Sequence, residues 1–461
     1  MKVLKIAVVP TRRGISSNRK GAFTVEDALK AKRETLQFLH EHKPQNVEFI
    51  TIDFLNAEGI MYDETHAEQV ALYLKKEDVD AIFILHCNFG CEEAVGRLCK
   101  IMRKPVFLWG ARDRKIASDG SRSTDTQCGL FASSRLLRRY GVAYTYALNC
   151  AKEDAEFLQR FETFLGAVRV YCAAQNMRIG QINARPKYFK SVMINESALC
   201  EQLGIDVVPV NIAVLIAQMQ KLQKERPQQI NAEIESLKQR FDTHATSEEK
   251  LHATATLVEA LKSIAQEYDL AGLAIECWTL TPAMLNCHPC LAIAELSDLG
   301  IPCCCETDIY GVIGSILLQA ASGAKSSVFF GEYTMRSSED DNTELIWHCG
   351  NAPYSLHGGS MKPELVDGKE NFPLKEGDIT IVRFDCDRNQ FYLFADEAQA
   401  SCGPYTLGTY YWAKMDDWRA WEYKFMEGPY IHHVSVADGM YKEILREACK
   451  YLPHLKFDCI R

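Results

Sequence analysis

The chain has 461 residues and a net charge of −9, and 47% of its residues are hydrophobic. This composition predicts a globular protein of about three domains and excludes a disordered or fibrous chain. The acidic balance disfavours nucleic acid as a partner, and no apolar run reaches the roughly 18 residues that a membrane helix needs. We find no export signal at the N-terminus, so the eighteen cysteines are expected to be free thiols in a reducing cytoplasm.

The first third of the chain alternates short apolar runs with helical segments. This repetition predicts a parallel sheet with helices on its faces, which we assign to a Rossmann-like domain over residues 1–165. The expected strands are Lys5–Val9, Val47–Asp53, Ala81–His86 and Pro105–Trp109, and the expected helices are Val25–His40, Glu64–Lys75 and Cys91–Arg103.

Polar loops follow three of these strands at their carboxyl ends, which is where parallel sheets bind ligands. The loops are Thr11–Gly14, His86–Gly90 and Gly110–Arg114. No glycine-rich phosphate-binding motif supports a nucleotide site. Arginine forks and the Asn88 amide suit a polar ligand, whereas ordinary polar surface loops are the alternative interpretation.

The middle third repeats the alternation after a long linking helix, and we assign residues 166–340 to a second Rossmann-like domain. The expected helices are Lys152–Gln175, Glu225–Arg240 and Glu248–Tyr268, and the expected strands are Arg178–Ile182 and Ile205–Val210. Three further strands, Leu270–Ile275, Pro302–Cys305 and Ser327–Gly331, are separated by helices over Pro282–Leu299 and Ile309–Ser322.

Each of these three last strands ends in a glutamate, namely Glu276, Glu306 and Glu332. If the last two strands are parallel neighbours, about 4.8 Å apart, the carboxylates of Glu306 and Glu332 converge. A buried pair of like charges is costly unless it shares a proton or holds a cation, so the pair predicts a divalent metal site. Helix caps or solvated loop acids are the alternative interpretation.

The last third, residues 341–461, has the alternating pattern of antiparallel strands. We expect a hairpin of Ile379–Phe384 and Phe391–Phe394, further strands over Tyr405–Trp412 and Tyr430–Val436, and a closing helix over Gly439–Tyr451. Short alternating strands of this kind predict a small antiparallel β-barrel or a sandwich.

Histidines of this last third are candidate partners of the two acids. They are His348, at the end of an apolar run, and the adjacent pair His432 and His433, of which only one can face a given site if both lie on a strand. Two carboxylates and two imidazoles suit Mn²⁺. The competing CxxC motif, Cys287–Cys290, has no second CxxC with which to complete a zinc site, so buried free thiols are favoured.

Two stretches resemble a known family. Cys305-Glu306-Thr307-Asp308-Ile309-Tyr310-Gly311 and Phe330-Gly331-Glu332-Tyr333-Thr334, with the histidine after Trp347, resemble the L-fucose/L-arabinose isomerase superfamily, closest to its fucose-isomerase-like branch. The resemblance implies an α/β fold, with two Rossmann-like parallel-sheet domains followed by a C-terminal antiparallel β-barrel-like domain. It implies a manganese site, with Co²⁺ or Mg²⁺ as alternatives, made of Glu306, Glu332, His348 and His432, or His433 in place of His432.

The function implied is a metal-dependent aldose–ketose isomerase that acts on a hexose or pentose through a cis-enediol, with Glu306 and Glu332 moving the protons. The expected substrate contacts are Arg13, Asn88, Glu276, Trp278, Tyr333 and Asn351. Superfamily members are homo-oligomers, typically hexamers, in which the first domain of one subunit covers the active site of the next.

The arginines of the first domain, Arg12, Arg13, Arg112 and Arg114, would suit a hexose with a sulfonate, phosphate or carboxylate group. Surface charge is the alternative explanation for them. A non-catalytic cytoplasmic sugar-binding or regulatory protein is the alternative function, and so is an aldolase or epimerase that uses the same enediolate chemistry.

Overall fold

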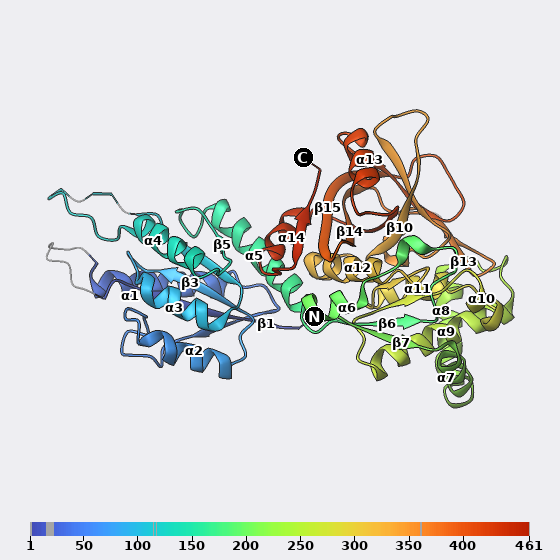
Figure 1. Cartoon of the computed structure of the whole chain (residues 1–461), viewed down its shortest axis with the longest axis horizontal. Helices are drawn as coiled ribbons and strands as arrows, with labels where there is room; N and C mark the ends of the chain where they lie inside the picture. Colours follow the sequence, from blue (N-terminus) through green and yellow to red (C-terminus); the bar gives the residue numbers. More distant parts are fainter. Residues whose placement is uncertain (1, 15–22, 114, 117, 360–361, 461) are drawn as a thin grey trace. The chain divides into compact units, whose positions relative to one another are not determined.

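The chain divides into two compact units, Met1–Cys172 and Ala173–Arg461 (Figure 1). The computed structural model describes residues 2–14, 23–113, 115–116, 118–359 and 362–460, so Arg114 of the third polar loop lies outside the described residues. No helix of these described segments is long and apolar enough to cross a bilayer.

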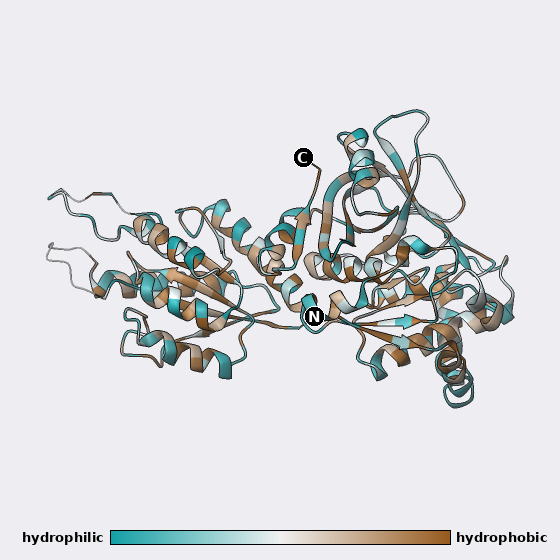
Figure 2. Cartoon of the chain, viewed as in Figure 1, coloured by the Kyte–Doolittle hydropathy of each residue, from teal (hydrophilic) through white to brown (hydrophobic). Residues whose placement is uncertain are grey.

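The first unit is built on a five-stranded parallel sheet with the order β2-β1-β3-β4-β5. Strands β3 and β4 are buried at every residue, as expected for a sheet that helices cover on both faces, and Figure 2 shows these strands as hydrophobic. The elements are β1 (Leu4–Thr11), α1 (Val25–Glu41), β2 (Val47–Thr51), α2 (His66–Lys76), β3 (Ala81–His86), α3 (Glu92–Met102), β4 (Val106–Gly110), α4 (Thr126–Arg139), β5 (Thr145–Tyr146) and α5 (Ala155–Ala174).

The strand order of this sheet reverses at β1 and β3, which makes their carboxyl ends the expected ligand edge. Thr11 pairs with His86 at this edge. Two of the predicted polar loops follow directly, with Arg12 and Arg13 after β1 and Asn88 after β3. The predicted parallel sheet is therefore confirmed, with these loops at the edge where such folds bind ligands.

The second unit begins with a four-stranded parallel sheet of the order β7-β6-β8-β9. Its elements are β6 (Arg178–Ile182), η1 (Lys190–Val192), α6 (Glu196–Ala198), η2 (Leu199–Leu203), β7 (Asp206–Val210), α7 (Ile212–Glu225), α8 (Pro227–Arg240), α9 (Glu248–Glu267), β8 (Gly272–Ile275), α10 (Leu280–Leu285), α11 (Cys290–Asp298), β9 (Cys303–Cys304) and α12 (Ile309–Ser322).

Two helical segments here differ from the sequence prediction. The single helix expected over Pro282–Leu299 is wrong, because Asn286 adopts a left-handed conformation (φ 56°) that ends α10, and α11 begins only after Pro289. The sequence analysis also missed α7, which Asn211 caps by accepting a hydrogen bond from the Ala213 N–H.

The chain ends in a closed antiparallel barrel of six strands, in the order β16-β11-β10-β17-β14-β15, which β15 and β16 complete by pairing with each other. The predicted C-terminal barrel is thereby confirmed. The elements are β10 (Phe329–Arg336), β11 (Thr343–His348), η3 (Tyr354–Leu356), β12 (Glu364–Val366), β13 (Lys369–Pro373), β14 (Gly377–Asp387), β15 (Gln390–Ser401), β16 (Thr409–Lys414), α13 (Trp418–Glu427), β17 (His433–Asp438), α14 (Lys442–Cys449) and β18 (Leu455–Asp458).

The predicted hairpin is β14 and β15, which pair from Gly377↔Ala400 to Asp387↔Gln390. Its two turn residues, Arg388 and Asn389, have φ values of 46° and 68°. A turn with two left-handed residues matches the right-handed twist of the strands and therefore favours this register.

The strand that carries Glu332 lies in a different sheet from the one expected. Strand β10 is antiparallel to β11 and β17 in the barrel, so it is not a parallel neighbour of β9. The prediction of two adjacent parallel acid-ended strands is therefore wrong. Any meeting of Glu306 and Glu332 depends on how the barrel packs against the second sheet.

Burial of Glu344 on β11 makes the stability of the barrel depend on pH. Glu344 is 3% exposed, and burial raises the pKa of its carboxyl to about 8, with Glu422 adding to the effect and Arg336 opposing it. The folded state therefore holds a proton that the unfolded chain loses near pH 4.5, and the free energy of unfolding falls between about pH 5 and pH 8.

We expect the free energy of unfolding of Glu344→Gln to fall much less over this pH range, because the amide stays neutral. Urea unfolding at several pH values measures the effect, and Glu339→Gln, at an exposed position, is the matched control. Parallel pH dependences in the wild type and in Glu344→Gln would contradict the prediction.

Candidate active site

Glu306 lies in a tight turn between β9 and α12. Glu306 and Thr307 have φ values of 61° and 57°, so two successive non-glycine residues adopt the left-handed conformation, at a cost of about 1–2 kcal/mol each. The turn is anchored by the Thr307 N–H, which donates to the Ile275 carbonyl at 3.2 Å, and by Asp308, which caps α12 by accepting from the Gly311 N–H. Such strain is typical of a functional residue.

Glu332 and His433 lie directly opposite each other on β10 and β17. Directly opposed residues of an antiparallel pair project from the same face of the sheet. The neighbouring Tyr333 projects from the other face, where it packs against the barrel core beside Trp418 and Phe425. The barrel register therefore brings Glu332 and His433 together and turns Tyr333 away from them.

The two glutamates converge on this histidine. His433 Nε2 lies 2.9 Å from Glu306 Oε2 and 4.0 Å from Glu332 Oε2. His432 Nε2 lies 3.5 Å from the same Glu332 oxygen. One ligand atom each from Glu332, His432 and His433 can be chosen within 4.8 Å of one another, which makes this trio a candidate metal site.

Both members of the histidine pair face the acids, which corrects the expectation that only one of them can. Strand β17 begins at His433, so His432 precedes the strand and the alternation of faces does not apply to it. The two imidazole rings lie 4.5 Å apart at an angle of 68°. The structure thus brings both His432 and His433 to the carboxylates.

His348 ends β11 and is 2% exposed. The Cys349 N–H donates to its Nδ1 at 2.9 Å, while its Nε2 is buried and has no hydrogen-bond partner among the described residues. The His348 imidazole interacts electrostatically with both Glu306 and Glu332. The predicted histidine is therefore beside the acids, with an unsatisfied ring nitrogen.

A buried ion network holds His433 in place. Its Nδ1 lies 2.9 Å from Asp308 Oδ2, and the same oxygen accepts from Arg383 Nη1 at 2.6 Å. Arg383 also donates to Asp385 at 3.0 Å, and it is 1% exposed. A carboxylate on one imidazole nitrogen orients the ring and directs the other nitrogen, Nε2, toward a ligand.

The sequence analysis missed Asp308 and Arg383 as parts of the site. Arg383 is the one basic residue in the apolar strand Ile379–Phe384, and a charge in a buried strand needs a buried partner. The position of Arg383 could therefore have indicated a buried ion pair, although it does not identify the acidic partner.

The electrostatics of the site separate the two glutamates. Burial raises the pKa of Glu332, and the Glu306 charge adds to this effect, while His348 and His433 oppose it. For Glu306, burial also acts upward, but His433, His348 and Trp278 outweigh it, so that the pKa of Glu306 is lowered. Glu306 is therefore the more strongly stabilised anion of the pair.

Aromatic side chains form one wall of the site. Trp278 Nε1 donates to Glu306 Oε1 at 2.7 Å, and its side chain is otherwise half exposed. Phe189, which sequence reasoning missed, packs edge-on against Trp278 at 5.2 Å and stacks on His433 at 5.6 Å. An exposed ring next to the acids is suited to the apolar face of a sugar.

Glu276 and Asn351 make internal contacts. Both oxygens of Glu276 accept hydrogen bonds from its own loop, through the N–H groups of Trp278, Thr279 and Thr281. Burial opposes ionisation of Glu276, but these donors lower its pKa. Asn351 donates to the Phe330 carbonyl at 3.0 Å from a buried position. Glu276 thus orders the loop that presents Trp278, and Asn351 supports the strand that carries Glu332.

Arg13 and Asn88 meet within the first unit. The Asn88 side-chain oxygen accepts from the Arg13 N–H at 2.9 Å, and its amide nitrogen is buried without a partner in the described chain. The Arg13 guanidinium lies 4.7 Å from the centroid of the Phe89 ring, whereas Arg12 is paired with Glu58. Arg13 therefore has no carboxylate partner within the described segments.

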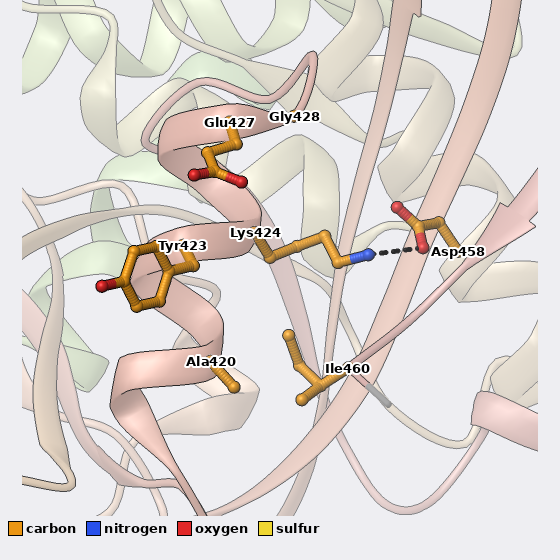
Figure 3. Close-up of a pocket in the computed structure, with 7 residues that line it drawn as sticks. All are labelled: Ala420, Tyr423, Lys424, Glu427, Gly428, Asp458 and Ile460. Carbon is orange, nitrogen blue, oxygen red and sulfur yellow. Dashed lines mark hydrogen bonds and ion pairs between the residues drawn. The ribbon is translucent and has the colours of Figure 1, made fainter.

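A cavity of about 500 Å³ in the second unit lies between α13 and the end of the chain (Figure 3). Its charged groups include Lys424 and Asp458, which form an ion pair at 2.8 Å. The cavity is lined by Ala420, Tyr423, Lys424, Glu427, Gly428, Asp458 and Ile460. It lacks the imidazoles that accompany the acids at the candidate site, so it is not a competing metal centre.

Comparison with known proteins gives consistent matches. The family model "Fucose/sulfoquinovose isomerase, N-terminal domain" matches residues 14–175. The sulfoquinovose isomerase of Priestia megaterium is 23% identical over 317 residues, which are 67% of this chain and 69% of that protein. The sulfoquinovose isomerase of Alkalicoccus urumqiensis is 22% identical over 311 residues, which are 66% of this chain and 68% of that protein.

We expect Arg383→Met to lower the free energy of unfolding by about 3–5 kcal/mol, because it leaves Asp308 and Asp385 as buried charges without their partner. Urea unfolding measures the loss. Arg388→Met, at an arginine that is 93% exposed on the same hairpin, is the matched control and is expected to change stability little. If the two substitutions lowered the free energy of unfolding equally, the buried ion network would not contribute the stability that we assign to it.

Proposed function

The chain belongs to the fucose isomerase-like superfamily, and on that basis we propose that it is an aldose–ketose isomerase whose active site is the cluster around Glu306, Glu332 and His433. The observation that carries the proposal is the meeting of two carboxylates with the histidine pair at a strained turn. The relatives named as sulfoquinovose isomerases support the reaction class.

We propose that the site takes a divalent cation, with Mn²⁺ preferred and Co²⁺ or Mg²⁺ as alternatives. The residues suit it, because Glu332, His432 and His433 each offer a ligand atom within 4.8 Å of one another. In addition, Glu306 Oε2, His348 Nε2 and His433 Nε2 are buried without a hydrogen-bond partner among the described residues. The sequence predicts Glu306, Glu332, His348 and His432 as the ligands. We propose the alternative, His433, in place of His432, because Asp308 holds its Nδ1 and its Nε2 lies 2.9 Å from Glu306. When bound, the cation would polarise the sugar carbonyl and stabilise the charge of the enediolate.

The protein groups divide the proton chemistry between them. Isomerisation removes the C2 proton of the aldose, passes through a cis-enediol and returns the proton to C1. Glu306 Oε1 accepts a hydrogen bond from Trp278 Nε1, and Glu306 Oε2 lies 2.9 Å from His433 Nε2. Glu332 is the less constrained carboxylate and its side chain is 21% exposed, so we assign the proton transfer between the two carbons to Glu332.

We propose an anionic hexose as the substrate, and a sulfonated aldohexose in particular. The named activity of the relatives supports this class. Arg13 supports it independently, because its guanidinium has no acid partner in the described residues and a fork of N–H donors matches the oxygens of a sulfonate.

Arg13 belongs to the first unit, and we propose that it serves the site of a neighbouring subunit in a homo-oligomer, with a hexamer as the expected assembly. We also propose that the protein acts in the cytoplasm. All eighteen cysteines are free in the structure, which supports a reducing compartment.

We expect Glu306→Gln and Glu332→Gln to lower kcat by at least about a thousandfold. Each substitution removes a carboxylate that either stabilises charge in the reaction or transfers a proton. Ketose formation from a sulfonated aldohexose measures the effect, and chelation followed by added Mn²⁺ tests the metal. Glu443→Gln, at an exposed glutamate, is the control.

Circular dichroism establishes that these variants are folded. Full activity of a folded Glu306→Gln or Glu332→Gln would refute the mechanism. Cleavage or epimerisation of the sugar, with no ketose formed, would favour an aldolase or epimerase instead.

We expect Arg13→Gln to raise the KM for the sulfonated hexose by about 10- to 100-fold, which corresponds to the loss of about 1.5–3 kcal/mol from a charged hydrogen bond. The KM for a neutral aldose should rise less. Mixing Arg13→Gln with Glu306→Gln subunits should restore part of the activity if one subunit supplies the arginine to the next. Equal changes for charged and neutral sugars would contradict the assignment.

A further inference from the structure

Two thiols next to the candidate active site face each other. Cys290, the first residue of α11, is 2% exposed, and Cys349 follows directly after β11. Their sulfur atoms are 3.6 Å apart. A disulfide bond is about 2.05 Å long, so a relative movement of about 1.5 Å would join the two sulfurs.

The two cysteines differ in access to solvent. Cys349 is partly exposed, whereas Cys290 is buried. A small oxidant would therefore reach Cys349 first and find Cys290 in place to react next. A second pair, Cys277 and Cys305, lies in the same region, but both of its members are buried.

Cys349 also touches His348. Its N–H donates to His348 Nδ1 at 2.9 Å, and its Sγ lies 3.4 Å from the same nitrogen. A disulfide with Cys290 would displace Cys349, which is the residue that makes both of these contacts. The thiol pair and the imidazole therefore form one packed unit.

We propose that Cys290 and Cys349 form an oxidation site for hydrogen peroxide, at which the two thiols close to a disulfide that disturbs His348. Cys349 attacks the peroxide O–O bond, which gives a sulfenic acid and releases one water. The Cys290 sulfur then attacks the Cys349 sulfur, the S–OH bond breaks, and a second water leaves as the disulfide forms. The peroxide takes up the two electrons that the thiols lose.

The consequence for the metal rests on the proposed function. If His348 holds the cation through Nε2, the ring proton is on Nδ1, and the Cys349 Sγ, 3.4 Å away, is the acceptor that supports it; a disulfide at Cys349 moves this sulfur. Loss of such a supporting contact typically costs 10- to 100-fold in metal affinity. Oxidation of the pair would thus weaken the site through His348.

The full-length chain, reduced and then treated with hydrogen peroxide, tests the oxidation site. The remaining thiols are alkylated under denaturing conditions, and the digest is analysed by mass spectrometry. We expect a cross-link between the peptides of Cys290 and Cys349 that dithiothreitol removes. In Cys290→Ser the link should be absent, and Cys349 should instead be trapped as a sulfenic acid by dimedone.

Cys287→Ser is the matched control, because Cys287 is buried three positions from Cys290 yet contacts Thr254. This variant should form the link as the wild type does. A link that persists in Cys290→Ser, a disulfide between Cys277 and Cys305 instead, or two alkylatable thiols after excess peroxide would each overturn the oxidation site.

Manganese titration of the reduced and oxidised chain tests the coupling to His348. We expect affinity to fall about 10- to 100-fold on oxidation of the wild type and of Cys287→Ser, but not of Cys290→Ser. Unchanged affinity in a fully cross-linked chain would refute the coupling. A chain that binds no manganese even when reduced would refute the proposed metal site, while the cross-link alone still decides the oxidation site.

Discussion

The buried carboxylate of Asp308 connects the parts of the second unit from which the candidate site is built. It caps α12, accepts from Arg383 on β14 and holds the Nδ1 of His433 on β17. Its oxygens therefore bind groups both from α12, which follows Glu306, and from the barrel, which carries Glu332. Because the arginine is itself buried and also paired with Asp385, the position of the imidazole is set by charge rather than by packing alone.

Several features that destabilise the folded state occur together at the candidate site. Glu306 and Thr307 adopt left-handed backbone conformations, Glu306 and Glu332 are like charges in a largely buried setting, and His348 keeps a nitrogen without a partner in the described chain. Each of these costs free energy in the folded state. A bound cation would relieve the last two, which supports the proposed cation site.

The sheet and the barrel contribute different properties to the site. The turn after β9 supplies a constrained carboxylate held by Trp278, while β10 and β17 supply Glu332 and the histidines in register. The thiols of Cys290 and Cys349 contact each other, and Cys349 contacts His348, so the proposed change in their oxidation state acts on the imidazole.

The sequence by itself determined the order of two parallel sheets and a barrel, because periodicity is a local property of the chain. Strand ends made Glu306 and Glu332 candidates, and the family resemblance added His348 and the histidine pair. Only the tertiary structure decided that β10 joins the barrel, that His432 and His433 both face the acids, and that Tyr333 packs against the barrel core. It also placed Phe189, Asp308 and Arg383 at the candidate site. Strand order and register between segments more than a hundred residues apart, such as Asp308 and His433, arise from packing between sheets, and no local pattern encodes them.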